Sequence, residues 1–185
     1  YQGLGDGLDE DAYSLRMMAE RLPELVVASS CSKNFGLYRE RTGSITFIAE
    51  SAEQVEVVAS QAMAVARQTY SMPPAHGALL VSLILGDQEL RAAWQTELDE
   101  VRHRIQSMRG LLAEGIQNNA AGQDFSHIVR QKGMFSFLGL KPEQLDALRE
   151  DYGIYIVSSS RVNLAGINSS NIGYLCDSIL AVLDK

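Results

Sequence analysis

The sequence predicts an α/β fold, because segments with the pattern of buried strands lie among segments with the pattern of amphipathic helices. Three observations support it: β-rich runs at residues 25–28 and 43–49, a helix-capping pattern at Ser51, and apolar residues at helical spacing over long stretches. The chain has 185 residues, of which 46% are hydrophobic and 21% charged. It is therefore long enough to bury a core, and its composition is not typical of disorder.

Three helices are expected around the two strands of the first half. Residues 9–21 carry apolar side chains three and four positions apart, and a proline follows them. Ser51 and Gln54 fit a capping box, so a helix is expected from there to about residue 69. After two prolines, an apolar helix is expected at residues 77–85. Strands and helices in this arrangement are typical of the α/β rhythm.

A long amphipathic helix is expected from Asp87, a good N-cap, to about residue 116. At ~1.5 Å per residue such a helix is about 45 Å long, which exceeds the width of a small domain. We therefore expect the helix, at about residues 87–117, to bridge two domains, residues 1–99 and 100–185. The second domain has α+β character. Its strands are expected at residues 125–130, 134–137, 154–157 and 161–164, and its helices at residues 142–151 and 168–183.

Charge and composition argue against several function classes. The net charge is −7 and no run of Lys or Arg offers the basic face that a nucleic acid needs. Cys31 and Cys176 form no CxxC pair, and His76, His103 and His127 have no mutual ligand spacing, so no metal site is indicated. No stretch is apolar enough to span a bilayer and no signal segment opens the chain, so we expect the protein in the cytoplasm. We expect both cysteines to be free thiols.

The most informative stretch surrounds Lys33, which follows the first predicted strand. Ser30 and Ser32 flank the lysine, and Arg41 follows it eight residues later. In α/β sheets, ligands bind at the carboxyl ends of strands. A desolvated lysine attacks carbonyls, while hydroxyls and an arginine fork bind phosphate. Together these are the requirements of pyridoxal phosphate, although the spacing alone leaves open a solvated surface lysine in a polar loop.

The motif Ser-x-Ser-Lys-Asn-Phe-Gly-Leu-Tyr-x-Glu-Arg-x-Gly, which begins at Ser30, resembles the cofactor-lysine signature of the aspartate aminotransferase subgroup of class I pyridoxal-phosphate aminotransferases. Residues 1–3, 70–77, 133–137 and 160–166 are similar to the family as well. The resemblance implies the C-terminal part of a fold type I pyridoxal-phosphate transferase. The first predicted domain would then be the C-terminal portion of the large cofactor-binding domain, and the second would be the small domain.

The resemblance also implies which residues bind the cofactor. Lys33 would form an aldimine with pyridoxal 5′-phosphate and later move the proton between the substrate Cα and the cofactor. Tyr1 would donate its phenol to the ring oxygen, and Ser30, Ser32 and Arg41 would hold the phosphate. A disordered terminal residue is the alternative for Tyr1.

Arg161 and Phe135 are the substrate residues that the resemblance implies within one subunit. Arg161 would bind the substrate α-carboxylate through two parallel hydrogen bonds, and Phe135 would line the pocket. Without the family, Arg161 reads as a surface charge at a strand edge, and Phe135 and Phe137 read as core residues. We expect Phe137 in the core.

Through Arg67 and Ser71, the resemblance also implies a homodimer with shared active sites. Arg67 would reach into the neighbouring subunit and pair with the side-chain carboxylate of dicarboxylic substrates, and Ser71 would lie near the partner's cofactor. A structural alternative for Arg67 is a favourable charge at a helix C-terminus. Met72 stands where aspartate-preferring members more often have Asn, which favours enzymes that also accept aromatic substrates.

The expected function is transamination of aspartate or aromatic amino acids with 2-oxoglutarate as the acceptor. Family members are about twice as long, and Tyr1 begins just after the expected position of the aspartate that pairs with the pyridine nitrogen. We therefore expect the 185 residues alone to be inactive. Two alternatives stay open: another fold type I enzyme, such as a decarboxylase or lyase, and a non-catalytic fragment that acts as a folding or dimerisation module.

Overall fold

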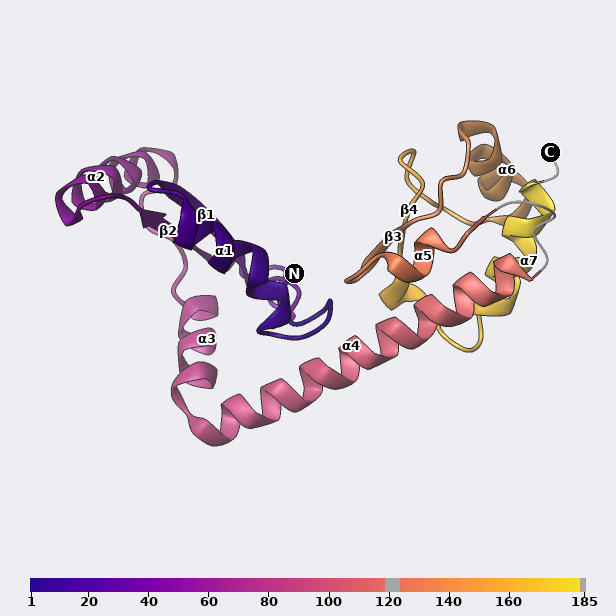
Figure 1. The fold of residues 1–185 in the computed structure, drawn as a ribbon, viewed down its shortest axis with the longest axis horizontal. Helices are drawn as coiled ribbons and strands as arrows, with labels where there is room; N and C mark the ends of the chain where they lie inside the picture. Colours follow the sequence, from indigo (N-terminus) through magenta and orange to yellow (C-terminus); the bar gives the residue numbers. More distant parts are fainter. Residues whose placement is uncertain (119–123, 184–185) are drawn as a thin grey trace. The chain divides into compact units, whose positions relative to one another are not determined.

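A computed structural model describes residues 1–118 and 124–183, which form two compact units. Unit 1 comprises Tyr1–Gly3 and Gly7–Leu98, and unit 2 comprises Leu4–Asp6 and Asp99–Lys185. The boundary falls inside the helix α4 (Gln88–Gln117), which is the long helix that the sequence predicts (Figure 1). That the units are the large and small domains of an aminotransferase stays a prediction.

Unit 1 contains one two-stranded antiparallel sheet. Strand β1 (Leu25–Ser30) pairs with β2 (Gly43–Ile48) in a register that runs from Leu25 opposite Ile48 to Ser30 opposite Gly43. No helix separates the strands, so the alternation of strands and helices that is typical of α/β folds does not hold between β1 and β2. The connecting loop turns back on itself through Gly36, whose φ is 66°, and it closes where the Cys31 N–H donates to the Thr42 carbonyl at 3.0 Å. The chain therefore reverses instead of crossing over.

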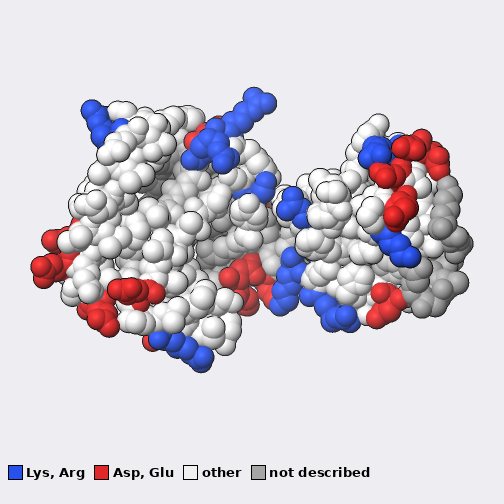
Figure 2. All heavy atoms as spheres, turned by 90° about the horizontal axis from the view of Figure 1, so that it is seen from above, with Lys and Arg blue, Asp and Glu red and all other residues white. Residues whose placement is uncertain are grey.

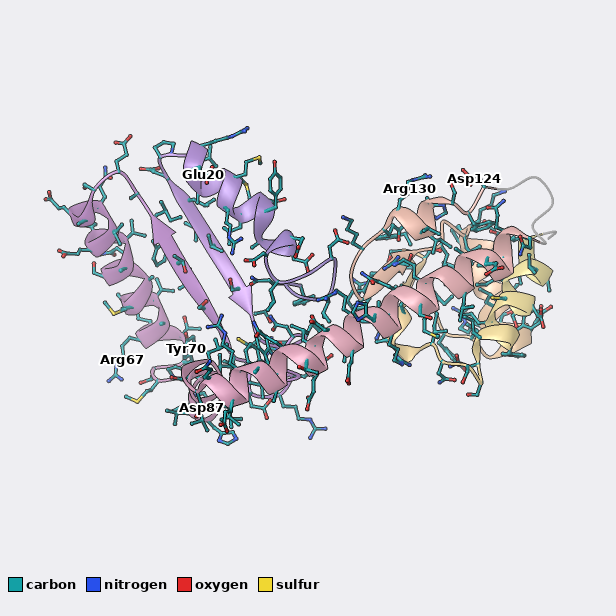
Figure 3. The ribbon with its side chains drawn as sticks, turned by 60° about the horizontal axis from the view of Figure 1, so that its bottom comes forward. Glu20, Arg67, Tyr70, Asp87, Asp124 and Arg130 are labelled. Carbon is teal, nitrogen blue, oxygen red and sulfur yellow. The ribbon has the colours of Figure 1, made fainter. Side chains whose placement is uncertain are left out.

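The helices of unit 1 begin at the capping residues that the sequence indicates. Ser51 and Gln54 form a reciprocal capping box with two bonds of 3.2 Å. The Asp87 carboxylate accepts N–H bonds from Glu89 and Leu90 at 2.9 Å at the start of α4 (Figure 3). The helices α1 and α2 run beside the hairpin (Figures 1 and 3). Besides α4, the helices are the 3₁₀ turn η1 (Glu10–Ala12), α1 (Tyr13–Arg21), α2 (Ala52–Thr69) and α3 (His76–Gly86).

Unit 2 packs short elements against the second part of α4. Strand β3 (Phe135–Phe137) pairs antiparallel with β4 (Arg161–Asn163). Ile105, Leu112 and Ile116 lie at most 1% exposed and form one buried stripe of α4, because their spacings of seven and four keep them on one helix face. The other helices are α5 (His127–Arg130), α6 (Pro142–Tyr152), the 3₁₀ turn η2 (Leu164–Gly166) and α7 (Ile172–Leu183).

The strand expected at residues 125–130 is wrong, because this segment forms the helical turn α5. Phe125 and Ile128 are both buried, and the Ile128 N–H donates to the Phe125 carbonyl at 3.0 Å. A spacing of three between buried residues fits a helical turn and not a strand. Asp124 begins the turn by accepting the Ser126 N–H at 2.8 Å, and hydrogen bonds from Ser126 lower the pKa of its carboxyl. Figure 3 shows Asp124 and Arg130 on either side of this turn.

Two further boundaries differ from expectation. Residues 154–157 alternate in exposure, but in the described part of the chain no strand pairs with them. The predicted strand is therefore wrong, because alternation is not sufficient without a partner. The helix expected from residue 168 begins at Ile172, because the Asn168 side chain accepts the N–H groups of Ser170 and Asn171 and caps the preceding turn.

The surface carries charges of both signs in each unit on the face that Figure 2 shows. The described residues on this face therefore offer no continuous basic surface. Among the helices that the structure describes, none has both the length and the apolar character needed to cross a membrane.

Candidate active site

Lys33 lies in the loop between β1 and β2, half-buried beside two aromatic rings. Its Nζ lies 4.2 Å from the centroid of the Tyr38 ring and 5.7 Å from that of the Tyr1 ring. Ring faces attract an ammonium group. The structure therefore brings Tyr1 and Lys33 together. The hydrogen bond from the Tyr1 phenol to a cofactor ring stays a prediction.

Ser30 and Ser32 face each other at the end of β1. The Ser30 hydroxyl donates to the Ser32 hydroxyl at 3.1 Å and accepts the Ser32 N–H at 3.2 Å. Gly43, opposite Ser30, allows this strand end to close, because a Cβ there would lie 2.3 Å from the Ser29 carbonyl oxygen. Cys31 lies between the two serines, and burial raises the pKa of its thiol.

Arg41 has a left-handed backbone with φ of 53°, which is uncommon for a residue with a side chain. Its Nη1 donates to the Tyr38 carbonyl at 3.1 Å. Tyr38 thus contacts Lys33 through its ring and Arg41 through its backbone. Sparsely populated backbone conformations concentrate at functional sites, and the conformation of Arg41 fits that tendency.

Trp94 of α4 anchors the residues that directly follow Lys33. Its indole N–H donates to the Asn34 carbonyl at 2.7 Å, and its ring stacks on Phe35 with centroids 4.5 Å apart and planes 9° apart. From the sequence, Trp94 is one apolar residue within the long amphipathic helix and is not expected at the site. No local signal reveals this contact, because 60 positions separate the two bonded residues.

The residues of this loop fit pyridoxal phosphate by their chemistry. An amine beside aromatic rings can bind an aldehyde, and two hydroxyls with a guanidinium are typical phosphate ligands. The side-chain oxygen of Asn34 is buried and, within the described part of the chain, accepts no hydrogen bond. Buried acceptors without a partner are uncommon in folded proteins, so this oxygen marks a place where a further donor fits.

Arg161 and Phe135 form a second cluster, in unit 2. The Arg161 guanidinium carbon lies 4.6 Å from the centroid of the Phe135 ring, which orients the exposed cation. Both residues line a cavity of about 420 Å³ together with Asn163 and Tyr174. Phe137 is 53% exposed, so its predicted core position is wrong. Its side chain alternates with that of Ser136, which occupies the buried face of β3.

Ser160 supports Arg161 and was not predicted as a site residue. It is 4% exposed and has a left-handed φ of 59°. Its hydroxyl accepts the Leu140 N–H and its carbonyl accepts the Leu138 N–H, both at 2.9 Å, while its own N–H donates to Val157 at 2.8 Å. The residue before Arg161 is therefore fixed on three sides. A serine in place of the glycine usual at such φ values gives no sequence signal.

Arg67 and Ser71 contact each other at the C-terminal end of α2. The Arg67 Nη1 donates to the Ser71 hydroxyl at 2.6 Å, and Ser71 has a left-handed φ of 65°. Figure 3 shows Arg67 at this end of the helix, near Tyr70. Both residues are exposed. Their predicted role in a neighbouring subunit's site stays a prediction.

The residues predicted from the sequence thus form groups within each unit. Among residues 1–118 and 124–183, no three His, Cys, Asp or Glu side chains gather as a metal site would require. Seven predicted site residues belong to unit 1: Tyr1, Ser30, Ser32, Lys33, Arg41, Arg67 and Ser71. Arg161 and Phe135 belong to unit 2.

Residues 1–179 match the family model described as aminotransferase class I and II, and the chain belongs to this family. The predicted family and the predicted α/β fold class are therefore confirmed.

Its relatives include aspartate and aromatic enzymes. An aspartate aminotransferase of Haemophilus influenzae is 51% identical over 183 residues, which are 99% of this chain and 46% of the relative. An aromatic-amino-acid aminotransferase of Pseudomonas aeruginosa is 46% identical over 182 residues, 98% of this chain and 46% of the relative. The structure of an aromatic-amino-acid aminotransferase from Burkholderia pseudomallei, covalently bound to pyridoxal phosphate, matches with a TM-score of 0.93 and 43% identity, over 99% of this chain and 46% of that one. The chain thus spans less than half the length of these relatives.

Proposed function

We propose that this chain carries the lysine-bearing part of a pyridoxal-phosphate aminotransferase that moves an amino group from aspartate or an aromatic amino acid to 2-oxoglutarate. The observation that supports this most is the placement of the Lys33 amine against the Tyr38 and Tyr1 rings, in the loop that follows Ser30 and holds Ser32 and Arg41. The covalently bound cofactor of the Burkholderia pseudomallei relative supports it as well.

When bound, pyridoxal phosphate supplies an aldehyde for a lysine amine and a conjugated ring that stores the electron pair released at the substrate carbon. Lys33 would hold and move a proton at its Nζ atom, whose position the Tyr38 and Tyr1 rings restrict. The Ser30 and Ser32 hydroxyls would donate hydrogen bonds to the phosphate of the bound cofactor, and the Arg41 guanidinium would add charge-assisted bonds.

Arg161 binds the α-carboxylate of the substrate in this proposal. A guanidinium fork makes two parallel bonds to a carboxylate, and the Phe135 ring at 4.6 Å restricts the orientation of the fork. A firmly held carboxylate does not leave as carbon dioxide. The arrangement therefore favours amino transfer over the decarboxylase or lyase alternative.

The assembly and location are proposed on separate grounds. We propose that residues 1–99 and 100–185 are the C-terminal portion of the large domain and the small domain, and that two copies form a homodimer with shared sites. The exposed Arg67 and Ser71, already oriented by their mutual bond, support the shared site. The free thiols of Cys31 and Cys176 support the cytoplasm. Sedimentation of the natural protein at the mass of one copy would contradict the dimer.

The direct test is an amino-transfer assay on the natural protein that carries this sequence, with aspartate or phenylalanine as donor and 2-oxoglutarate as acceptor. We expect glutamate to form with both donors, and the Lys33→Ala variant to lose this activity. Lys141→Ala is the matched control, because Lys141 is exposed and its backbone N–H, which alanine keeps, donates to the Gln144 side chain at the start of α6.

Three results would contradict the proposal in different ways. Equal activity of the Lys33→Ala variant and the unmodified protein would remove the lysine from the mechanism. Release of carbon dioxide without glutamate would favour the lyase alternative. A failure to transfer amino groups from any α-amino acid, without a near-visible cofactor absorbance, would favour the non-catalytic module.

A further inference from the structure

Arg109 is a buried charge that binds backbone carbonyls instead of a carboxylate. It lies on α4, is 4% exposed, and its Nη1 donates to the Ile128 carbonyl at 3.0 Å and to the Ser136 hydroxyl at 3.1 Å. Its Nη2 donates to the carbonyls of Gly133 at 2.6 Å and Phe135 at 3.2 Å. In the described residues, no carboxylate lies within ion-pair distance of it.

A buried guanidinium among neutral acceptors is costly, because desolvation opposes its charge. The same desolvation lowers the pKa of Arg109 from its ordinary value. A leucine or methionine would fill the volume at lower cost. We therefore attribute the presence of this arginine to the geometry that its four hydrogen bonds impose on residues 128–136.

The network continues from Arg109 along β3. The Ser136 hydroxyl, 1% exposed, donates to the Gln131 side-chain oxygen at 2.6 Å, and that oxygen accepts the Phe137 N–H at 2.8 Å. Phe135 and Ser136 of β3 thus bond directly to Arg109, and Phe137 is linked to it through Gln131 and the Ser136 hydroxyl. A fully satisfied buried polar network of this kind fixes one local arrangement.

Strand β3 in turn supports Arg161. Phe137 pairs with Arg161 and Phe135 pairs with Asn163 across the β3–β4 ladder, and the Leu164 N–H donates to the Met134 carbonyl at 2.9 Å. The Phe135 ring lies against the Arg161 guanidinium. A shift of β3 would therefore move both the backbone and the side-chain contact of Arg161.

We propose that Arg109 is a positioning residue for Arg161: it fixes the Phe135 carbonyl and the Ser136 hydroxyl of β3 so that β4 and the Phe135 ring hold the Arg161 guanidinium ready for a substrate α-carboxylate. The role of Arg161 rests on the proposed function. The contacts of Arg109 with β3, and the pairing of β3 with β4, do not depend on that role.

The test compares Arg109→Lys, Arg161→Ala and the double variant in the natural protein. Lysine keeps the charge but lacks the planar fork, so it cannot serve four acceptors. Ser136→Ala removes a single acceptor and gives a milder second variant. Leu148→Ala, at a fully buried position of α6, is the control that destabilises unit 2 without contacting β3 through the network.

Two readouts are needed. Hydrogen exchange measures the amides of Phe135–Phe137 and Arg161–Asn163, and calorimetry measures binding of 3-indolepropionic acid, a carboxylate present with one solved relative. We expect Arg109→Lys to speed exchange in both strands more than in α7, and to weaken binding about tenfold, as for one charged hydrogen bond. In the Arg161→Ala background the same change should have no further effect on binding.

The outcomes separate the two proposals. Exchange that is unchanged in β3 and β4, or that rises equally throughout unit 2 as in Leu148→Ala, would overturn the positioning role. An equal loss of binding with and without Arg161 would overturn it as well, because Arg109 would then act independently. If the unmodified protein neither binds the carboxylate nor transfers amino groups, the proposed function fails, and the exchange rates alone decide whether Arg109 holds the strands.

Discussion

Replacing Ser160 tests whether the backbone before Arg161 is held as the structure shows. Ser160→Ala removes the acceptor of the Leu140 N–H and leaves that donor buried, since Leu140 is 7% exposed. An unsatisfied buried donor costs about 1–3 kcal/mol. The left-handed backbone is retained, so the strain that already exists at φ 59° is not relieved.

Ser160→Gly separates the two contributions, because it removes the hydroxyl and also the strain. A side chain in the left-handed region costs roughly 1–2 kcal/mol, which glycine recovers. Glycine loses about 0.4–1 kcal/mol of this through its freer unfolded chain. We therefore expect Ser160→Gly to be more stable than Ser160→Ala by about 1 kcal/mol and less stable than the unmodified protein.

The assay is urea unfolding of the natural protein followed by circular dichroism, with hydrogen exchange of the Leu140 amide as the local readout. Exchange of that amide should rise in both variants, since both lose its acceptor. An alanine variant as stable as the unmodified protein, or more stable than the glycine variant, would refute the reasoning. Unchanged exchange at Leu140 would show that the hydroxyl is not the acceptor.

Three other predictions concern single contacts. Trp94→Phe should keep the stack on Phe35 but lose the indole bond, lowering the free energy of unfolding by about 1 kcal/mol; an unchanged urea midpoint would contradict this. Gly153→Ala should lower it by a similar amount, because α6 ends there at φ 64°; a gain in stability would contradict the left-handed cap. Burial raises the thiol pKa values of Cys31 and Cys176 from their ordinary value of 9.0, so these thiols deprotonate at lower pH in the unfolded chain than in the folded one. The free energy of unfolding should therefore fall as the pH rises beyond 9.0. Serine at both positions should flatten that decline, and a decline of equal slope would contradict it.

Local signals were sufficient for most of the helices. Ser51 and Gln54 predict the start of α2, and Asp87 predicts the start of α4, because helix caps depend on neighbours in the sequence. The segment at residues 154–157 shows the limit. A strand needs a partner, and alternation along one segment does not supply it.

The site divides in the same way. Lys33 and Arg41 stand in a motif, so the sequence itself proposes a role for them, whereas Trp94, Arg109 and Ser160 make contacts that only folding creates. Arg109 reaches residues 19–27 positions away, and nothing in its own neighbourhood distinguishes it from a surface arginine on a long helix. Such residues are found only when their hydrogen-bond partners are known.

Reductive trapping with borohydride in the presence of pyridoxal phosphate tests the central claim most directly. Digestion and mass spectrometry should locate the added mass on Lys33 and on none of Lys132, Lys141 or Lys185, because Lys33 lies beside two aromatic rings in the loop where we propose that the cofactor binds. Label spread evenly over the four lysines, or absent from Lys33 in the natural protein, would contradict the account.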